Sequence, residues 1–157
     1  MQNRMKTHQL TQEQIAELLK NQHVGTLATV NKNGSPYVTP VHFVYEDGKI
    51  YIHGLPVGQK VENIIANGLV SFNAYNMNGY LMDAEGKPCD TNTAYQSVIA
   101  QGKAAMVKDK LEKTRILHLI VEKYTPQLSD KILPDNMVNG TGVIAVEVSE
   151  ITGKYWE

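Results

Sequence analysis

The sequence has very little arginine and a single cysteine. Only two of its 15 basic residues, Arg4 and Arg115, are arginines, and 16 Asp and Glu residues bring the net charge to −1. A nucleic-acid surface normally needs a clustered basic stripe, so this charge balance argues against a nucleic-acid partner. Cys89 has no second cysteine, which excludes an internal disulfide and a cysteine-only metal cluster.

Long apolar runs are also missing. No stretch approaches the roughly 18 consecutive apolar residues of a membrane-spanning helix, and residues 1–14 are polar rather than signal-like. We therefore expect no membrane partner, and the lone cysteine fits the reducing cytoplasm. With 157 residues, 42% of them hydrophobic, the chain is long enough to bury one core unaided.

Common metal and nucleotide motifs are absent as well. The five histidines never occur at His-x-x-x-His spacing and no Cys-x-x-Cys occurs, so we expect no metal site. The glycine-rich phosphate loops of ATP-binding and dinucleotide-binding proteins are missing too. Nucleophilic catalysis by Cys89 would need a histidine base close in space, and a thiol in a polar loop is more often incidental.

The pattern of apolar and turn residues predicts mostly strands. Thr11 and Gln14 form a capping-box pattern for a leading helix over residues 11–19. Segments rich in β-branched and aromatic residues follow, separated by turns that contain Asn or Gly. They predict six strands, over residues 24–30, 37–45, 49–54, 69–75, 95–107 and 143–148.

Two further helices are expected, over residues 58–68 and 109–124, from the helical spacing of their apolar residues. Residues 76–93 and 126–142 are expected to be irregular, and residues 152–157 to form a tail. Gly102 inside the fifth strand predicts a bulge or a close backbone approach. Because crossover helices do not alternate regularly with the strands, the pattern favours a closed antiparallel barrel over a parallel sheet.

Three residues at the start of the second predicted helix are candidates for anion binding. At Gly58, Gln59 and Lys60, the first backbone amides of a helix, its positive dipole end and an ammonium group could converge on a phosphate. The same residues are equally compatible with a solvated lysine where a loop meets a helix. His53, at the end of the preceding strand, points either into a pocket or to solvent. Trp156, the only tryptophan, either packs over the barrel rim or forms a wall for a planar ligand.

Several segments, taken in order, resemble the pyridoxamine 5′-phosphate oxidase-like FMN-binding split barrels. They read GTLAT (25–29), NGSPYVTPV (33–41), IYIHG (50–54), QK (59–60) and YQSV (95–98). The resemblance extends from about His23 to Trp156. The nitroimidazole-resistance (Nim-type) branch is the most similar, on the histidine after the third strand, on Cys89 ahead of YQSV, and on Glu112 and Lys113 at the start of the late helix.

The resemblance implies a mainly β protein with flanking helices, built as a six-stranded antiparallel Greek-key split barrel. In that arrangement residues 1–22 would form an N-terminal helix packed on a barrel of residues 23–157, as one domain. The family further implies a homodimer that binds two FMN molecules in grooves between its subunits.

The resemblance also implies a set of site residues. His53 would donate a proton or hydrogen bond to the substrate, or anchor the phosphate instead. The expected cofactor contacts are Thr39, Pro40 and Val41 along the isoalloxazine ring, His53, Gly54, Gln59 and Lys60 near the phosphate, Gln96 and Ser97 from a later strand, and Trp156 over the ring.

Departures from the family pattern narrow the expected activity. The oxidases of pyridoxamine phosphate carry arginines around the phosphates of FMN and substrate, where this chain has Tyr37 and Gln59. We therefore expect a different FMN-dependent oxidoreductase, which reduces a small planar acceptor such as a nitroaromatic. A protein that holds a flavin, haem or drug-like ligand without turnover is the alternative. Relatives of this architecture also bind haem or a deazaflavin, so the fold leaves the choice of cofactor open. Haem binding and degradation is a third possible function, and it would need an axial ligand such as His42, His53 or His118.

Overall fold

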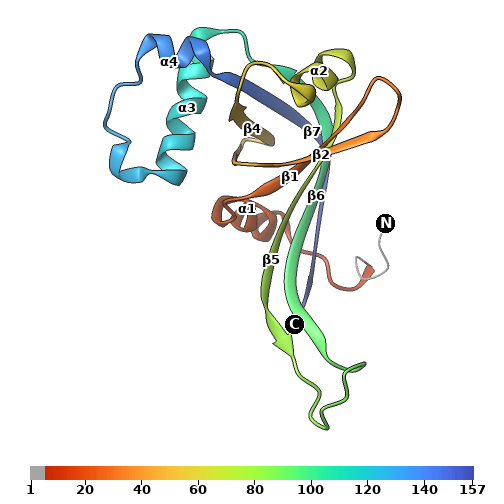
Figure 1. Ribbon diagram of the computed structural model, residues 1–157. Helices are drawn as coiled ribbons and strands as arrows, with labels where there is room; N and C mark the ends of the chain where they lie inside the picture. The colour runs from red at the N-terminus through yellow and green to blue at the C-terminus, as the bar shows by residue number, and fades with distance from the viewer. Residues whose placement is uncertain (1–5) are drawn as a thin grey trace.

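Seven antiparallel strands form one sheet in the computed structural model, which describes residues 6–157 (Figure 1). The strands are β1 (Gly25–Val30), β2 (Pro36–Val41), β3 (Phe43–Glu46), β4 (Lys49–Gly54), β5 (Leu69–Leu81), β6 (Asn92–Met106) and β7 (Gly142–Trp156). Their order in the sheet is β2-β1-β5-β6-β7-β4-β3. This is the expected antiparallel split barrel with flanking helices, although the number of strands differs.

The expectation of six strands is wrong by one, and the reason lies at His42. The single strand expected over residues 37–45 is broken there, because β2 pairs with β1 whereas β3 pairs with β4. These two strands are the opposite edges of the sheet, yet His42 alone separates them in the chain. The sheet must therefore curl until its edges approach each other, which makes the barrel.

The helices begin where their capping residues predict. α1 (Gln12–Asn21) starts at a complete capping box, in which Gln14 N donates to Thr11 Oγ1 and Thr11 N donates to Gln14 Oε1. α3 (Lys110–Tyr124) starts at Asp109, whose side chain accepts a hydrogen bond from Glu112 N. α2 (Gln59–Ala66) lies within the second predicted helical segment.

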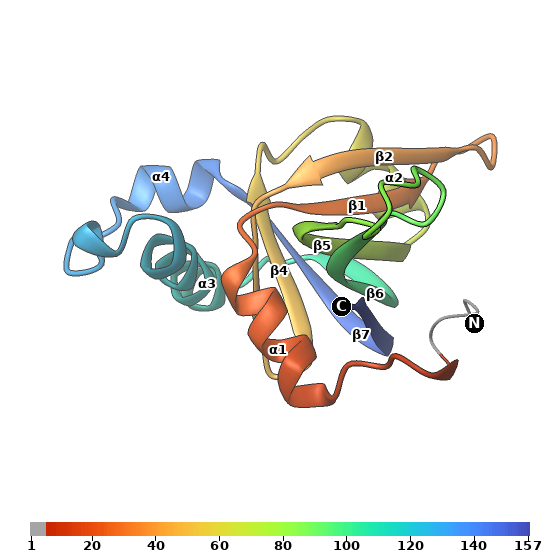
Figure 2. The same cartoon turned by 90° about the horizontal axis from the view of Figure 1, so that it is seen from below.

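The stretch over residues 126–142 is more regular than expected. It holds a short 3-10 helix (Pro126–Leu128) and α4 (Asp135–Gly140), which lies beside α3 (Figure 2). Both helices are too short to show a repeating apolar pattern, which is why the sequence did not reveal them. Within residues 6–157, no helix is long and apolar enough to cross a membrane.

β5 and β6 extend beyond their predicted ends and form a long arm (Figure 1). The loop expected over residues 76–93 shrinks to residues 82–91, and β7 likewise continues through the expected tail to Trp156. The predicted irregularity at Gly102 is confirmed, since the β6–β7 register shifts between Gln101 and Gly102. A Cβ at Gly102 would lie 2.1 Å from the Glu147 carbonyl oxygen, so the backbones meet too closely for any side chain.

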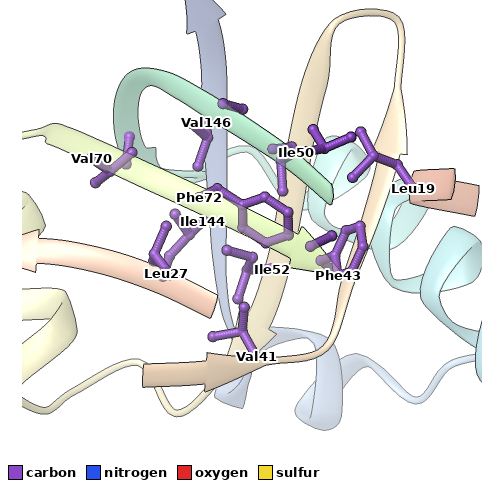
Figure 3. Packing of buried hydrophobic residues seen from close by; sticks show 14 of the residues in the cluster. Leu19, Leu27, Val41, Phe43, Ile50, Ile52, Val70, Phe72, Ile144 and Val146 are labelled. Carbon is purple, nitrogen blue, oxygen red and sulfur yellow. The ribbon is translucent and has the colours of Figure 1, made fainter. Parts of the chain in front are cut away.

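The core divides between the two faces of β4. Ile50 and Ile52 point into the barrel, where Phe43 and Phe72 meet edge to face with ring centroids 4.7 Å apart (Figure 3). Tyr51 points the other way and packs in a second cluster that includes residues of α3. Strand alternation therefore places His53 on the α3 side of β4.

Candidate functional site

A groove of about 340 Å³ lies where the two edges of the sheet approach each other. It is formed by the end of β2, the β2–β3 junction, the end of β4 and the first turn of α2. We call it the histidine groove, and its lining residues are Val24, Pro40, Val41, His42, His53 and Lys60. Three of these side chains can carry positive charge and none is a carboxylate, so the groove suits an anionic ligand.

His53 presents an unpaired nitrogen inside the molecule. Its Nδ1 atom is buried and has no hydrogen-bond partner among residues 6–157. Burial lowers the pKa of His53 below its ordinary value, and the neighbouring His42 and Lys60 lower it further. Most buried polar side-chain atoms in proteins are hydrogen-bonded, so this nitrogen is a candidate for contact with a ligand.

Lys60 stands at the second position of α2 and is half-buried in the groove rather than solvated. Burial lowers the pKa of the Lys60 ammonium. Its Nζ atom would lie 3.9 Å from a Cβ at Gly54, which places the amine against the end of β4, next in sequence to His53. Gly58, the residue that precedes α2, has φ of 117°, in the region that favours glycine.

Asn63 fixes α2 against the barrel and so fixes the position of Lys60. Its amide nitrogen donates to Thr29 Oγ1 (3.0 Å) and Asn31 Oδ1 (2.8 Å), both at the β1 end. Its amide oxygen accepts from Gln59 Nε2 at 2.8 Å, so Gln59, an expected phosphate ligand, turns toward Asn63 and does not line the groove. The sequence offered a weak signal for Asn63, a polar residue next to Ile64 on the apolar face of a helix.

His42 lies beside His53, with ring centroids 6.3 Å apart. The sequence marked His42 only as a possible haem ligand, yet its ring stacks on Tyr124 of α3 at 4.7 Å between centroids and 25° between planes. Tyr124 Oη accepts from Phe43 N (2.8 Å) and donates to His23 O (2.6 Å). α3, which is distant in sequence, thus supports one wall of the groove. No local sequence motif predicts this contact.

A second groove, of about 470 Å³, lies along the arm of β5, β6 and β7. We call it the hairpin groove, and its lining residues are Asn73, Tyr75, Thr91, Asn92, Thr93, Tyr95, Ser97, Ile99 and Lys154. The rings of Tyr75 and Tyr95 are 5.8 Å apart, and Lys154 Nζ lies 5.5 Å from the Tyr95 centroid. This groove offers aromatic faces, neutral hydrogen-bonding groups and the Lys154 ammonium.

The structure divides the expected cofactor contacts between these two places. Pro40, Val41, His53 and Lys60 line the histidine groove, whereas Ser97 lines the hairpin groove.

Gln96 and Trp156 lie beside the hairpin groove on β6 and β7, where Trp156 pairs with Tyr95 in the register of the strands. The Trp156 ring contacts His8, with centroids 4.6 Å apart.

The remaining candidates lie outside both linings. The Thr39 hydroxyl is buried on β2 and has no hydrogen-bond partner within the described chain. Cys89 is exposed in the loop over residues 82–91. Residues 6–157 contain no group of three or more His, Cys, Asp or Glu side chains placed to hold a metal ion.

The fold and the groove define an antiparallel split-barrel protein with a basic groove at the edges of its sheet. The chain belongs to the pyridoxamine 5′-phosphate oxidase family, whose sequence model matches residues 11–155. The resemblance inferred from the sequence is thereby confirmed for nearly the whole chain. No curated protein sequence matches it.

Solved structures show the same fold. A candidate 5-nitroimidazole antibiotic resistance protein from Bacteroides thetaiotaomicron is 26% identical, with 94% of this chain and 86% of that chain covered and a TM-score of 0.78. A flavocytochrome from Azotobacter vinelandii is 19% identical, with 100% and 72% covered and a TM-score of 0.86. An FAD- and haem-binding protein from Mycobacterium smegmatis is 16% identical, with 96% and 74% covered and a TM-score of 0.85.

Proposed function

We propose that this protein is an FMN-dependent oxidoreductase that reduces a small planar acceptor such as a nitroaromatic, and that it works as a homodimer in the cytoplasm. The observation that carries the proposal is the unpaired, buried His53 Nδ1 beside Lys60, in a groove without carboxylates. In a member of this family, such a groove has the chemistry needed for the cofactor phosphate. The single exposed cysteine fits a reducing compartment.

The charges in the histidine groove fit a phosphate monoester, which carries about −1.5 to −2 charges at neutral pH. Lys60 would supply one fixed positive charge, and His53 Nδ1 would donate a hydrogen bond when protonated. Gly54 lies beside Lys60 at the end of β4, since a Cβ there would be 3.9 Å from Lys60 Nζ. When bound, FMN accepts electrons from a reductant and passes them to the acceptor, while the protein orients the ring and excludes water.

The β2 strand fits the polar edge of a flavin ring. It is an edge strand that, within the described part of the chain, pairs with β1 alone, so half of its backbone groups face away from the sheet. Pro36 and Pro40 have no N–H, which leaves mainly carbonyl acceptors near those positions. Thr39, Pro40 and Val41 would use this edge to orient the isoalloxazine ring.

The homodimer would bring the two grooves together. One copy would supply the positively charged histidine groove, and the other would supply Ser97, Gln96 and the aromatic residues around its hairpin groove, with Trp156 over the ring. Two structural relatives support a flavin, since one is a flavocytochrome and the other is an FAD- and haem-binding protein. The nitroimidazole resistance candidate supports a nitroaromatic acceptor.

Spectroscopy of the purified protein tests the proposal. We expect a yellow protein that releases FMN on denaturation, and an apoprotein whose Tm rises when FMN is added. The bound flavin should be reduced by NADH or NADPH in the absence of oxygen, and a nitroimidazole should reoxidise it stoichiometrically. A colourless protein that FMN does not stabilise would overturn the proposal.

The non-enzymatic alternative predicts a different result in the same experiment. A protein that sequesters a flavin or drug would bind its ligand but show no stoichiometric electron transfer to the nitroimidazole. Haem binding would instead give a Soret shift that disappears on replacing one histidine. His42 and His53 are the two histidines in the groove, so His42→Gln and His53→Gln are the variants to compare.

A further inference from the structure

We propose that a cavity between α1, β3 and α3 binds a small organic carboxylate, whose charged group contacts Lys123 and whose apolar body lies on Val44 and Leu119. The cavity has a volume of about 690 Å³, within the range of about 300–1,000 Å³ that is typical of small-molecule sites. It shares no lining residue with the histidine groove or the hairpin groove. The proposal therefore does not depend on the proposed function.

The cavity lies around the free edge of β3. Both α1 and α3 pack against this strand, which is an edge of the sheet. Val44 is buried in the cluster that includes residues of α3, whereas Tyr45 packs against the barrel core, yet both line the cavity. Neighbouring strand residues point to opposite faces, so the cavity must extend past the strand edge from one face to the other. With Leu119 from α3, these side chains form walls that suit an apolar ligand body.

Lys123 brings a positive charge into these apolar walls without an anionic partner. Its side chain is half-buried, its Nζ atom donates to Leu19 O at 2.9 Å, and it lies 3.9 Å from the centroid of the Phe43 ring. Within residues 6–157 this ammonium makes no salt bridge. An ammonium has three N–H donors, and the carbonyl uses one of them. Charges that leave water are normally paired, so a carboxylate is the partner that fits here.

The other charges around the cavity do not replace this partner. The remaining titratable groups in the lining are Lys20, His23, Glu46, Asp47 and Glu122. Glu46 is already paired with Arg115 of α3. The other four residues are exposed to solvent at the mouth of the cavity, where water and salt screen their charges. Lys123 is thus the charge that selects the ligand.

Lys123 also has a structural role, which the experiments must separate from binding. Leu19 lies in the last turn of α1, where carbonyl groups lack partners within the helix. The hydrogen bond from Lys123 satisfies one of them, and its positive charge suits the negative end of the helix dipole. Replacing Lys123 should therefore lower stability, so binding and unfolding have to be measured separately.

The first test compares three probes that share one ring system. Calorimetry should show that 2-naphthoate binds at least about tenfold more tightly than the neutral 2-naphthamide, because it alone makes a charge-assisted hydrogen bond. The cationic 2-naphthylmethylamine should bind most weakly. FMN is added to each titration to occupy the proposed flavin site. Equal affinity for naphthoate and naphthamide would overturn the inference.

Variants of Lys123 assign the preference to its charge. Lys123→Met should lose about 10- to 100-fold of the naphthoate affinity and keep the naphthamide affinity. Lys123→Arg, which keeps the charge, should still prefer naphthoate. Lys32→Met, in the exposed β1–β2 turn, is the matched control and should bind like the unchanged protein. Unchanged naphthoate affinity in Lys123→Met, with urea unfolding showing that this variant is folded, would overturn the inference.

Methyl NMR of the unchanged protein locates the probe without any substitution. Naphthoate should shift the methyl signals of Val44 and Leu119 but not that of Val41 in the histidine groove. Shifts confined to Val41 would overturn the inference.

Two further measurements keep this site distinct from the flavin site. Lys60→Ala should bind naphthoate normally, and Lys123→Met should bind FMN normally. A protein that binds naphthoate through Lys123 but never binds FMN would refute the proposed function alone, whereas FMN binding without naphthoate binding would refute this inference alone.

Discussion

The histidine groove and the hairpin groove differ in what they offer a ligand. The first is built from short strands and a helix packed on the core, and it concentrates positive charge around a buried imidazole. The second lies on an arm that projects from the barrel (Figure 1), and it offers tyrosine rings, hydroxyls and amides together with one lysine, Lys154. A flavin phosphate needs the first kind of surface, and a planar ring system benefits from the second.

The arm cannot fold back on its own histidine groove. β5, β6 and β7 are continuous strands of 13, 15 and 15 residues, hydrogen-bonded to one another along most of their length. Bending them back would break these ladders. The two halves of the proposed site are therefore complementary in chemistry but held apart by rigid strands. A second copy of the chain could bring one groove of each kind together.

The largest expected effect comes from removing the fixed charge of the histidine groove. Lys60→Ala should weaken FMN binding about 10- to 100-fold, since charge-assisted hydrogen bonds contribute about 1.5–3 kcal/mol. Riboflavin binding should change little. Fluorescence titration measures both affinities, with Lys32→Ala in the exposed β1–β2 turn as control. An FMN affinity equal to that of Lys32→Ala would remove Lys60 from the site.

Loosening the support of α2 should affect the histidine groove alone. Asn63 is 1% exposed and makes three side-chain hydrogen bonds, so Asn63→Ala should lower the free energy of unfolding by about 2 kcal/mol. FMN affinity should fall several-fold as Lys60 loses its fixed position. Urea unfolding and FMN titration check the two effects, with Asn67→Ala at the exposed helix end as control. Loss of stability with unchanged FMN affinity would show that α2 is not needed for binding.

Mixing two defective variants tests whether the grooves belong to one shared site. Lys60→Ala breaks the histidine groove, and Tyr95→Ala should break the hairpin groove by removing a ring that contacts Tyr75 and Lys154. After unfolding and refolding a one-to-one mixture, random pairing in dimers should restore about a quarter of the binding sites. Separately refolded variants that are then combined serve as control. No recovery, or a monomer in sedimentation at micromolar concentration, contradicts the shared site.

Replacing a second half-buried lysine, Lys123, should have the smallest effect on FMN affinity. Lys123 lies over the Phe43 ring, donates to Leu19 O at 2.9 Å, and lines a different cavity of about 690 Å³. Burial lowers its pKa from the ordinary 10.5 to about 8. Lys123→Met should leave FMN affinity unchanged, since this amine is outside both grooves.

The same variant should change the pH dependence of stability. Between pH 8 and 10.5 the folded chain has released the Lys123 proton while the unfolded chain retains it, so this residue makes stability rise with pH. Lys123→Met removes this contribution. Urea unfolding at several pH values measures the free energy of unfolding of both proteins. As pH rises from 8 to 10.5, the free energy of unfolding of the unchanged protein should increase relative to that of Lys123→Met.

Local sequence signals predicted most of the fold. Thr11 and Gln14 marked α1, and the alternation of Ile50, Tyr51 and Ile52 correctly assigned the two faces of β4. The break at His42 was missed because residues 37–45 have an unbroken strand-like composition, and only pairing with different neighbours divides them. The strand segments over residues 76–81 and 92–94 were missed. Their side chains are mostly outside the core, so they show no alternation of apolar and polar residues.

The site was predicted less completely than the fold. Lys60 and His53 were selected as candidates because a motif and a family resemblance pointed to them, and the structure places both in one groove. Asn63 and Tyr124 were missed because their partners lie far away in the sequence, on β1 and at the β2–β3 junction. Contacts of this kind exist only after folding, so no local pattern records them.

The position of β7 has a consequence for how the protein is made. β7 is the last strand in the chain, yet it lies between β6 and β4. Among the strands of residues 6–157, β7 alone joins the β3–β4 hairpin to the rest of the sheet. During synthesis, β4 cannot form its backbone hydrogen bonds with β7 until residues 142–156 have left the ribosome. The apolar side chains of the β3–β4 hairpin are not stably packed before that point. Until then the unfinished chain exposes unpaired strand edges and is open to aggregation, so chaperone binding to nascent chains should persist until β7 has emerged.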